Sequence, residues 1–295
     1  MLRVSVGIPA YNEEANIGKL LEKLLEQEEK TIKISEIMVI ASGCTDRTEE
    51  IVREFAKKDR RVKLFVRKER EGKTAADNLF ISKARGEILV LACADILPKR
   101  DCFENLVAPF SNPKIGVTAA RMIPLNKKES LPGYFSHLWW RLFDRVAVDH
   151  FRAGEIMAFR RLAKRIPQEI GADEVYLTDR IMAQGYQGKY VASAVANNMG
   201  PKTIREAIRM RRRHACHHFQ FLSFGPKVYY PKTMDNFYVF RLFLKEVNWF
   251  SLKEAILGIL SALLEGFSRL LAYFDFYSQK KYRVWPRSGS TKRLE

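Results

Sequence analysis

Two adjacent carboxylic acids, Asp173 and Glu174, are well suited to acid–base chemistry. They stand at the start of a predicted helix over 175–184, which stops at Gly185. The positive end of a helix dipole favours ionised carboxylates, and a carboxylate can take a proton from a hydroxyl group. The pair is therefore a candidate general base.

Other polar residues follow predicted strands. In an open α/β sheet, ligands bind beyond the carboxyl ends of the strands. The sequence therefore places a set of residues beside a ligand: Pro9, Tyr11 and Glu13 after the first strand, Ser42 after the second, and Asp95 after the fourth.

The order of the elements supports this placement. Short apolar strands over 4–8, 36–40, 62–66 and 88–91 alternate with helical patterns. This order predicts an α/β fold with a mostly parallel, Rossmann-like sheet flanked by helices on both faces. After Pro98 the alternation loosens, and the predicted elements are a helix over 131–145, a strand over 155–160 and a basic helix over 203–218.

Between residues 3 and 218, a series of motifs resembles the family 2 glycosyltransferases, which transfer sugars from activated nucleotide donors. The motifs are Val4–Glu14, Ile40–Thr48, Glu71–Asn78, Leu91–Ile96, Phe151–Arg161, Gly171–Arg180 and Arg209–His214. The resemblance implies a type A glycosyltransferase fold and an inverting reaction, in which an acceptor hydroxyl attacks the anomeric carbon of the sugar.

On the donor side, the resemblance implies that Pro9, Tyr11, Glu13 and Ser42 lie against the nucleotide. It also implies that Lys73 and Asn78, from the Gly-Lys-x-x-Ala-x-Asn element, lie beside the donor. In the family, the turn after the second strand usually reads Asp-Asp-Gly-Ser-x-Asp. Here Ala41 and Ser42 replace the acidic pair, so the sequence names no preferred base.

The family's metal motif, Asp-x-Asp, aligns with Cys93, Ala94 and Asp95. Asp95 matches the acid that binds a Mg or Mn ion bridging the donor phosphates, whereas Cys93 replaces the first acid. A hard cation prefers oxygen to a neutral thiol. The prediction is a Mg or Mn ion on Asp95, with Cys93 and Ala94 close to the donor.

On the acceptor side, the family pattern Glu-Asp-x-x-Leu-x-x-Arg aligns on Leu177 and Arg180 and gives the catalytic position to Glu174, with Asp173 close behind. A Gln-x-x-Arg-Trp element aligns with 210–214. That alignment implies that three residues contact the diphosphate: Arg212, Arg213 and His214. A zinc site is an alternative for His214 and His218, which are four residues apart on a predicted helix, although no further ligand pair stands nearby.

The net charge of +17 is unevenly distributed. Residues 201–295 contain 18 Lys/Arg and 7 Asp/Glu, a net +11, against 33 and 27, or +6, in residues 1–200. A basic C-terminal third suggests an anionic partner such as a membrane surface, a diphosphate or a nucleic acid. No recognisable nucleic-acid module is present, so we expect no nucleic-acid partner.

The predicted organisation is a catalytic domain over 1–224, an amphipathic and aromatic region over 225–285, and a frayed tail over 286–295. Within the domain, 1–98 is assigned to the nucleotide-sugar and 99–224 to the acceptor. The pattern from Leu252 to Phe274 has a wide apolar face but no uncharged run long enough to span a bilayer. It predicts helices on the cytoplasmic face of the membrane, or else a helix that covers the catalytic domain or a partner subunit.

The expected partners are a nucleotide-sugar donor, a lipid-linked or glycan acceptor and an anionic membrane surface, with a homo-oligomer left open. The four scattered cysteines indicate free thiols in a reducing compartment. The rival functions are a non-catalytic membrane-associated protein that keeps this fold and a sugar nucleotidyltransferase. The second lacks its expected Gly-rich loop after the first strand.

Overall fold

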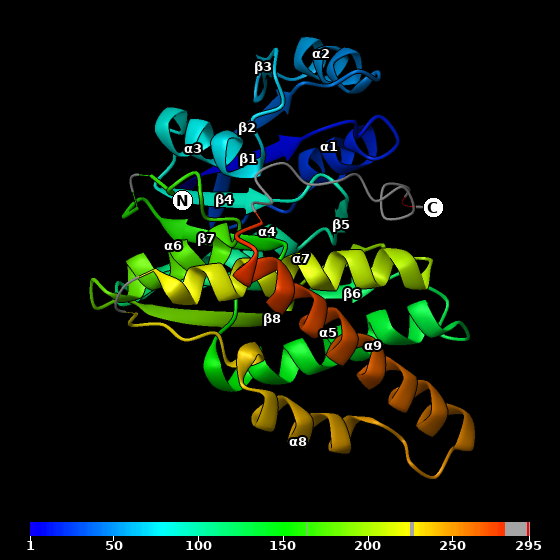
Figure 1. Cartoon of the computed structure of the whole chain (residues 1–295). Helices are drawn as coiled ribbons and strands as arrows, with labels where there is room; N and C mark the ends of the chain where they lie inside the picture. Colours follow the sequence, from blue (N-terminus) through cyan, green and yellow to red (C-terminus); the bar gives the residue numbers. More distant parts are fainter. Residues whose placement is uncertain (164, 225–226, 281–293, 295) are drawn as a thin grey trace.

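The computed structural model describes residues 1–163, 165–224, 227–280 and 294. At its centre is an eight-stranded sheet with the strand order β3-β2-β1-β4-β7-β6-β8-β5 (Figure 1). The strands are β1 (Leu2–Ala10), β2 (Ile32–Ser42), β3 (Val62–Arg67), β4 (Ile88–Ala92), β5 (Ile96–Pro98), β6 (Ile115–Pro124), β7 (Ile156–Arg160) and β8 (Gln187–Asn198).

The first half of the sheet is parallel, as predicted: β1 pairs with β2 and β4, and β2 pairs with β3. The second half is mixed. Strand β7 runs antiparallel to both β4 and β6, β5 runs antiparallel to β8, and β6 pairs in parallel with β8. The α/β fold with helices on both faces is confirmed, and the antiparallel strands are an addition to it.

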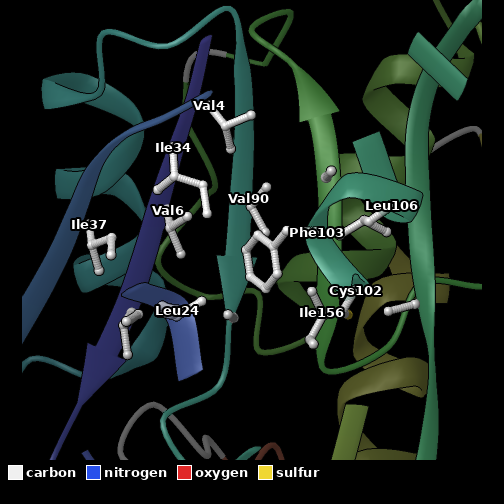
Figure 2. Close-up of a cluster of buried hydrophobic side chains, with 14 of the residues drawn as sticks. Val4, Val6, Leu24, Ile34, Ile37, Val90, Cys102, Phe103, Leu106 and Ile156 are labelled. Atoms are coloured by element: carbon white, nitrogen blue, oxygen red, sulfur yellow. The ribbon is translucent and has the colours of Figure 1, made fainter. Parts of the chain in front are cut away.

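Helices cover both faces of this sheet, and each face has its own core. On one face, α1 (Ile17–Leu25), α2 (Thr48–Lys58) and α4 (Cys102–Val107) close over β1, β2 and β4. Figure 2 shows Leu24, Phe103 and Leu106 packed against the strand residues of this cluster. The short helix η1 (Ala108–Ser111) follows α4.

On the other face lie α3 (Lys73–Lys83) and α6 (Asp173–Met182). Phe80 of α3 lies so close to β1 that a Cβ at Gly7 would be 2.3 Å from its ring. Only glycine permits this close packing, which brings the start of α3 near the end of β1.

The remaining helices are α5 (Leu131–His150), α7 (Ile204–Ser223), η2 (Lys232–Met234), α8 (Asn236–Glu246) and α9 (Leu252–Tyr277). Side chains of Ser130, Thr203, Asp235 and Ser251 accept hydrogen bonds from first-turn backbone N–H groups and so fix where α5, α7, α8 and α9 begin. In Figure 1, α9 crosses α5 and α7, and α8 lies beside α5.

Helix α9 packs with its polar stripe inward. Residues buried along it include Gly258, Ser261, Ser268 and Asp275. The opposite face exposes large apolar side chains: Leu252, Ile256, Ile259, Leu260, Leu263, Phe267, Leu270, Tyr273, Phe274 and Tyr277. We call these ten residues the apolar face of α9. The predicted amphipathic helix is therefore present, with its polar side against the protein.

One expectation about α9 is corrected. The charges at Glu265, Arg269 and Asp275 suggested that no segment of the chain is apolar enough to span a membrane. By length and composition, however, α9 is long and apolar enough to cross one. Its most apolar stretch has a mean hydropathy of 1.6, and 28% of that stretch is buried. Its charged residues are engaged with the protein, which explains how an apolar helix accommodates them.

The predicted boundary at 224 coincides with the end of α7, and residues 225–226 lie outside the described residues. Most of the predicted tail, 286–295, also lies outside them. Leu294 is the exception, because it is buried and its backbone N–H donates to the Asn16 side chain at 3.0 Å. At this residue the expected fraying is wrong.

Glu265 links α9 to α7 through arginines. The Arg211 guanidinium donates to both oxygens of Glu265, at 2.7 and 2.9 Å, and Arg269 donates at 2.7 Å. Burial alone would raise the pKa of Glu265, but the charges and hydrogen bonds of Arg211 and Arg269 lower it to about 2.

We predict that Glu265→Gln lowers the free energy of unfolding by about 3 kcal/mol near neutral pH, because it leaves the buried Arg211 without its counter-charge. The pKa of Glu265 is depressed in the folded chain, so its contribution is present above its ordinary value of 4.5 and is lost as the pH falls toward 2. Urea unfolding across that pH range tests this, with Glu22→Gln on the exposed face of α1 as the control. A gap between Glu265→Gln and wild type that does not narrow in acid would contradict it.

Candidate active site

A cavity of about 330 Å³ opens beyond the carboxyl ends of β1, β2 and β4. Helices α3, α5, α6 and α7 and the segments 152–155 and 198–201 also contribute to its wall. Twelve of the residues singled out in the sequence line it: Pro9, Tyr11, Glu13, Ser42, Lys73, Cys93, Ala94, Asp95, Asp173, Glu174, Arg213 and His214. Asn78 and Arg212 are not among the lining residues.

At the β1–β2 end of the cavity, the Arg70 guanidinium lies over the Tyr11 ring, 3.6 Å from its centroid. Ser42 is hydrogen-bonded to the loop that carries Arg70. Its Oγ donates to the Glu69 carbonyl at 3.0 Å and accepts from the Glu71 N–H at 3.2 Å. This end therefore presents a flat aromatic and cationic surface. Arg70 lies outside every motif in the sequence, and only the fold brings it to Tyr11.

Lys73 holds the acid pair to α3. Its ammonium bridges Asp77 at 3.2 Å and Asp173 at a shorter distance. Burial disfavours the charged ammonium, yet the carboxylates of Asp173 and Asp77 raise the pKa of Lys73 well above its usual value. Burial raises the pKa of Asp77 to about 7. Lys73 therefore stays protonated, and Asp173 is committed to it as an ion-pair partner.

Glu174 has a different environment. Its nearest cation is the buried Arg152, whose Nη2 lies 3.4 Å from Oε1 and 2.8 Å from His218 Nε2. Burial and the negative charge of Asp173 raise the pKa of Glu174, and Arg152 only partly offsets them. Of the two adjacent acids, Glu174 is thus the one without a close ammonium partner.

Asp95 and Glu155 bring two further carboxylates to the cavity. Burial raises the pKa of Asp95 to about 6, and burial together with Asp95 raises the pKa of Glu155 to about 8. Beside them, Asn198 is 4% exposed and its Oδ1 has no hydrogen-bond partner in the described part of the chain. These are oxygen donors, so the residues fit a hard divalent cation such as Mg or Mn.

The thiol of Cys93 does not fit that role. Burial and the nearby Glu155 charge raise its pKa well above the ordinary value, so the sulfur stays protonated. A neutral thiol is a poor ligand for a hard cation.

Helix α7 directs Arg212 and Arg213 to different sides. Arg213 and His214 line the cavity, and the charge of Arg213 reaches Asp95. Arg212 instead makes two hydrogen bonds to Asp275 of α9 at 2.5 Å. The predicted contact of Arg212 with a diphosphate is therefore wrong, because one residue along a helix turns the side chain by about 100°.

The predicted role of Asn78 is also wrong. Its side-chain amide accepts from the Ile166 N–H at 2.7 Å and donates to the Ile166 carbonyl at 2.8 Å. It therefore holds the segment between β7 and α6 against α3. The alternative of a zinc site at His214 and His218 finds no support either, since the described residues contain no group of three or more His, Cys, Asp or Glu side chains that could hold a metal ion.

Helix α5 supplies an aromatic wall that the sequence analysis did not assign to the site. Phe135, Trp139, Trp140 and Phe143 line the cavity, and Trp140 meets Phe143 edge to face at 5.0 Å. The Arg211 guanidinium lies 3.4 Å from the Trp139 ring centroid. The aromatic-rich pattern of 131–145 was visible in the sequence, but nothing in it indicated which side of the helix faces a ligand.

Comparison with known proteins connects this site to a family. The family model described as "Glycosyl transferase family 2" matches residues 5–159. A probable glycosyltransferase of Bacillus subtilis is 26% identical over 236 residues, which cover 72% of this chain and 54% of that protein. A beta-monoglucosyldiacylglycerol synthase of Nostoc is 32% identical over 129 residues, covering 43% and 27%. The chain thus spans about half or less of the length of these curated relatives.

Among solved structures, a mannosyltransferase from Pyrobaculum calidifontis in complex with GDP-Man and Mn²⁺ has a TM-score of 0.65 at 24% identity, covering 95% of this chain and 88% of that one. The glucosyl-3-phosphoglycerate synthase of Mycobacterium tuberculosis, with Mn²⁺ and UDP, has a TM-score of 0.54 at 18% identity, covering 78% and 88%. These likenesses show the fold.

We predict that Asn78→Ala costs about 2 kcal/mol of stability, because two backbone groups of Ile166 lose their partner. Nucleotide affinity should stay unchanged, since Asn78 does not line the cavity. Thermal unfolding and calorimetric titration with UDP and GDP test both parts. Tyr11→Ala is the comparison variant, expected to weaken nucleotide binding. A nucleotide-specific loss in Asn78→Ala at full stability would contradict the bracing role.

Proposed function

The chain belongs to glycosyl transferase family 2, and from that premise we propose that it is an inverting glycosyltransferase that moves a sugar from a nucleoside-diphosphate donor to a lipid-linked acceptor. The observation that carries the proposal is the contrast between the two adjacent acids. Asp173 is paired with Lys73, whereas Glu174 faces the cavity with a raised pKa. The catalytic mechanism follows from this division.

In this mechanism Glu174 is the general base. A carboxylate whose pKa is raised toward the working pH accepts a proton more readily than an ordinary one. Arg152, held by His218, keeps its guanidinium beside Glu174 and fixes the direction of that carboxylate. Asp173 has a positioning role, because its ion pair with Lys73 ties the start of α6 to α3. The deprotonated acceptor then attacks the anomeric carbon from the side opposite the leaving diphosphate.

The departing diphosphate needs positive charge. Arg213 lines the cavity and acts electrostatically on Asp95, so its guanidinium is placed to stabilise phosphate oxygens. Asp95, with Glu155 and Asn198 beside it, would hold a Mg or Mn ion. When bound, such an ion stabilises the negative charge that develops on the leaving group. The solved relatives in complex with Mn²⁺ and a guanosine or uridine nucleotide support this assignment.

A lipid-linked acceptor fits two features of the molecule. The aromatic wall of α5 gives one side of the cavity an apolar surface. Phe135 of that wall belongs to the same buried cluster as Leu264 of α9, so the cavity wall and the helix with the exposed apolar face share a core. Two relatives, a beta-monoglucosyldiacylglycerol synthase and a dolichyl-phosphate beta-glucosyltransferase, are named for lipid acceptors, which supports such an acceptor here.

We also propose that the protein lies on the cytoplasmic face of a membrane. The apolar face of α9 is continued on and after α8 by exposed aromatic residues: Phe237, Phe240, Trp249 and Phe250. Aromatic residues mixed with Arg241, Lys245 and Lys253 suit the interface of an anionic bilayer. Since the polar side of α9 is used inside the protein, we propose that this helix lies in the interface.

We predict that Glu174→Gln lowers the transfer rate by a factor of about 100 to 10,000, since the acceptor loses its base. Donor affinity should be preserved, because the substitution keeps the shape of the side chain. In wild type, the rate should fall as the pH drops through a pKa above the ordinary 4.5 of glutamate, and the variant should lack that dependence.

The assay is release of nucleoside diphosphate from UDP-, GDP- and dTDP-sugars with Mn²⁺ and diacylglycerol in vesicles, because the acceptor group of diacylglycerol is a hydroxyl that must lose a proton. Glu169→Gln, an exposed acid in the segment before α6, is the matched control. Wild-type rates in Glu174→Gln would overturn the assignment of the base. No donor binding in wild type would favour the non-catalytic alternative.

We predict that the double variant Leu263→Glu/Phe267→Glu weakens binding to anionic phospholipid vesicles on the order of 100-fold, through lost apolar contact and added repulsion. Both side chains are exposed, at 64% and 51%, so the thermal stability should not change. Vesicle co-sedimentation measures the effect. Val66→Glu, an equally drastic change at an exposed position on β3, is the control. Undiminished sedimentation of the double variant would exclude this face as the contact.

A further inference from the structure

Cys93 and Glu155 face each other across two strands. Strand β4 pairs with β7 in antiparallel register, with Leu91 opposite Met157 and Ala92 opposite Ile156. Continued by one residue, the register sets Cys93 opposite Glu155, and the Cys93 N–H indeed donates to the Glu155 carbonyl at 3.1 Å. Side chains of directly opposite residues lie on the same face of a sheet, with Cβ atoms about 5 Å apart. The Glu155 carboxyl therefore stands beside the Cys93 thiol, and both line the cavity.

Asn198 fixes the direction of the Glu155 carboxylate. Its Nδ2 donates to Glu155 Oε2 at 2.9 Å. Asn198 itself is held on β8 opposite Ile96, the residue after Asp95. Three oxygen-bearing side chains from three strand ends thus converge: Asp95, Glu155 and Asn198.

The charges in this group are unbalanced. Asp95 acts on Glu155 as a like charge. Among the described residues, no Lys or Arg side chain forms an ion pair with Glu155. The amide of Asn198 uses its donor on Glu155, which leaves its buried Oδ1 without a partner in the described structure. Arg213 acts electrostatically on Asp95. Burying the Glu155 carboxylate beside that like charge without an ion-pair partner of its own is costly, and a polar atom with no partner adds to that cost.

We propose that Glu155, oriented by Asn198, supplies the second carboxylate of the divalent-cation site at Asp95. It would take the place of the first acid of the Asp-x-Asp motif, which Cys93 replaces in this chain. The second acid of the site would thus stand directly before β7 and not directly after β4. The Asn198 Oδ1 is the third protein oxygen available to the ion or to a water bound to it. This inference rests on the proposed function, because the remaining ligands would be oxygens of the donor diphosphate and water. That is the usual way in which proteins bind Mg with one or two carboxylates.

The proposal also accounts for why a cysteine is tolerated at position 93. A cysteine thiol is ordinarily neutral near pH 7, so it can stand next to Glu155 without adding to the repulsion between the carboxylates. An aspartate at position 93 would bring a third carboxylate into the same small space. Cys93 and Glu155 are therefore expected to be coupled positions, and an acid is required at one of them.

The test is manganese binding, measured by the loss of the free Mn²⁺ electron paramagnetic resonance signal. The full chain is titrated with Mn²⁺ alone and with Mn²⁺ plus UDP or GDP. Glu155→Gln is expected to weaken Mn²⁺ binding on the order of 100-fold, as Asp95→Asn does. The double variant Cys93→Asp/Glu155→Gln is expected to recover affinity, because it returns the acid to the other strand. Recovery also excludes misfolding as the cause of the loss.

Glu104→Gln is the matched control. Glu104 is a nearly buried acid that accepts hydrogen bonds from Lys30 and Thr31 and does not line the cavity, so its loss should leave Mn²⁺ affinity unchanged. Wild-type affinity in Glu155→Gln, with loss in Asp95→Asn, overturns this inference and leaves the proposed function standing. A double variant that folds but binds no better than Glu155→Gln also overturns it. A wild-type chain that binds no Mn²⁺ with either nucleotide overturns both.

Discussion

Four carboxylates around a single cavity set the main constraint on this molecule. Asp95, Glu155 and the adjacent pair Asp173 and Glu174 come from three parts of the chain and meet at the cavity. Charges withdrawn from water require counter-charges, and the fold supplies a different cation to three of these four carboxylates. Lys73 neutralises Asp173, Arg152 stands by Glu174, and Arg213 reaches Asp95. Because Asp173 has a close lysine partner and Glu174 does not, we assign a positioning role to Asp173 and propose Glu174 as the general base.

Helix α7 connects this cavity to the apolar surface of the molecule. Its arginines alternate in direction: Arg213 faces the cavity, and Arg212 is anchored to Asp275 of α9. Arg211 does both, since it lines the cavity, stacks on Trp139 and is held by Glu265. A displacement of α9 would therefore also move the cavity-lining residues of α7, because they belong to the same rigid helix.

The sequence correctly located those cavity residues whose position follows directly from the order of the strands. Strand ends in the parallel half must meet at one edge, so Tyr11, Ser42 and Asp95 were correctly placed at the cavity. Asn78 and Arg212 were misplaced because motif spacing does not say which way a side chain on a helix points. Glu155 was missed because its neighbour Cys93 is more than 60 residues away, across an antiparallel pairing that the βαβ pattern does not predict.

The direction of α9 was equally undetermined, since an amphipathic pattern fits either face against the protein. The structure turns the polar stripe inward, where Glu265 pairs with Arg211 of α7 and Asp275 pairs with Arg212. The apolar face is then left to the outside, where water does not solvate it favourably. Under the proposed function, a bilayer interface would meet both demands: lipid would cover the apolar face, while the ion pairs beneath it would be shielded from water and strengthened. The proposed membrane contact and the geometry of α7 would then both follow from one helix orientation.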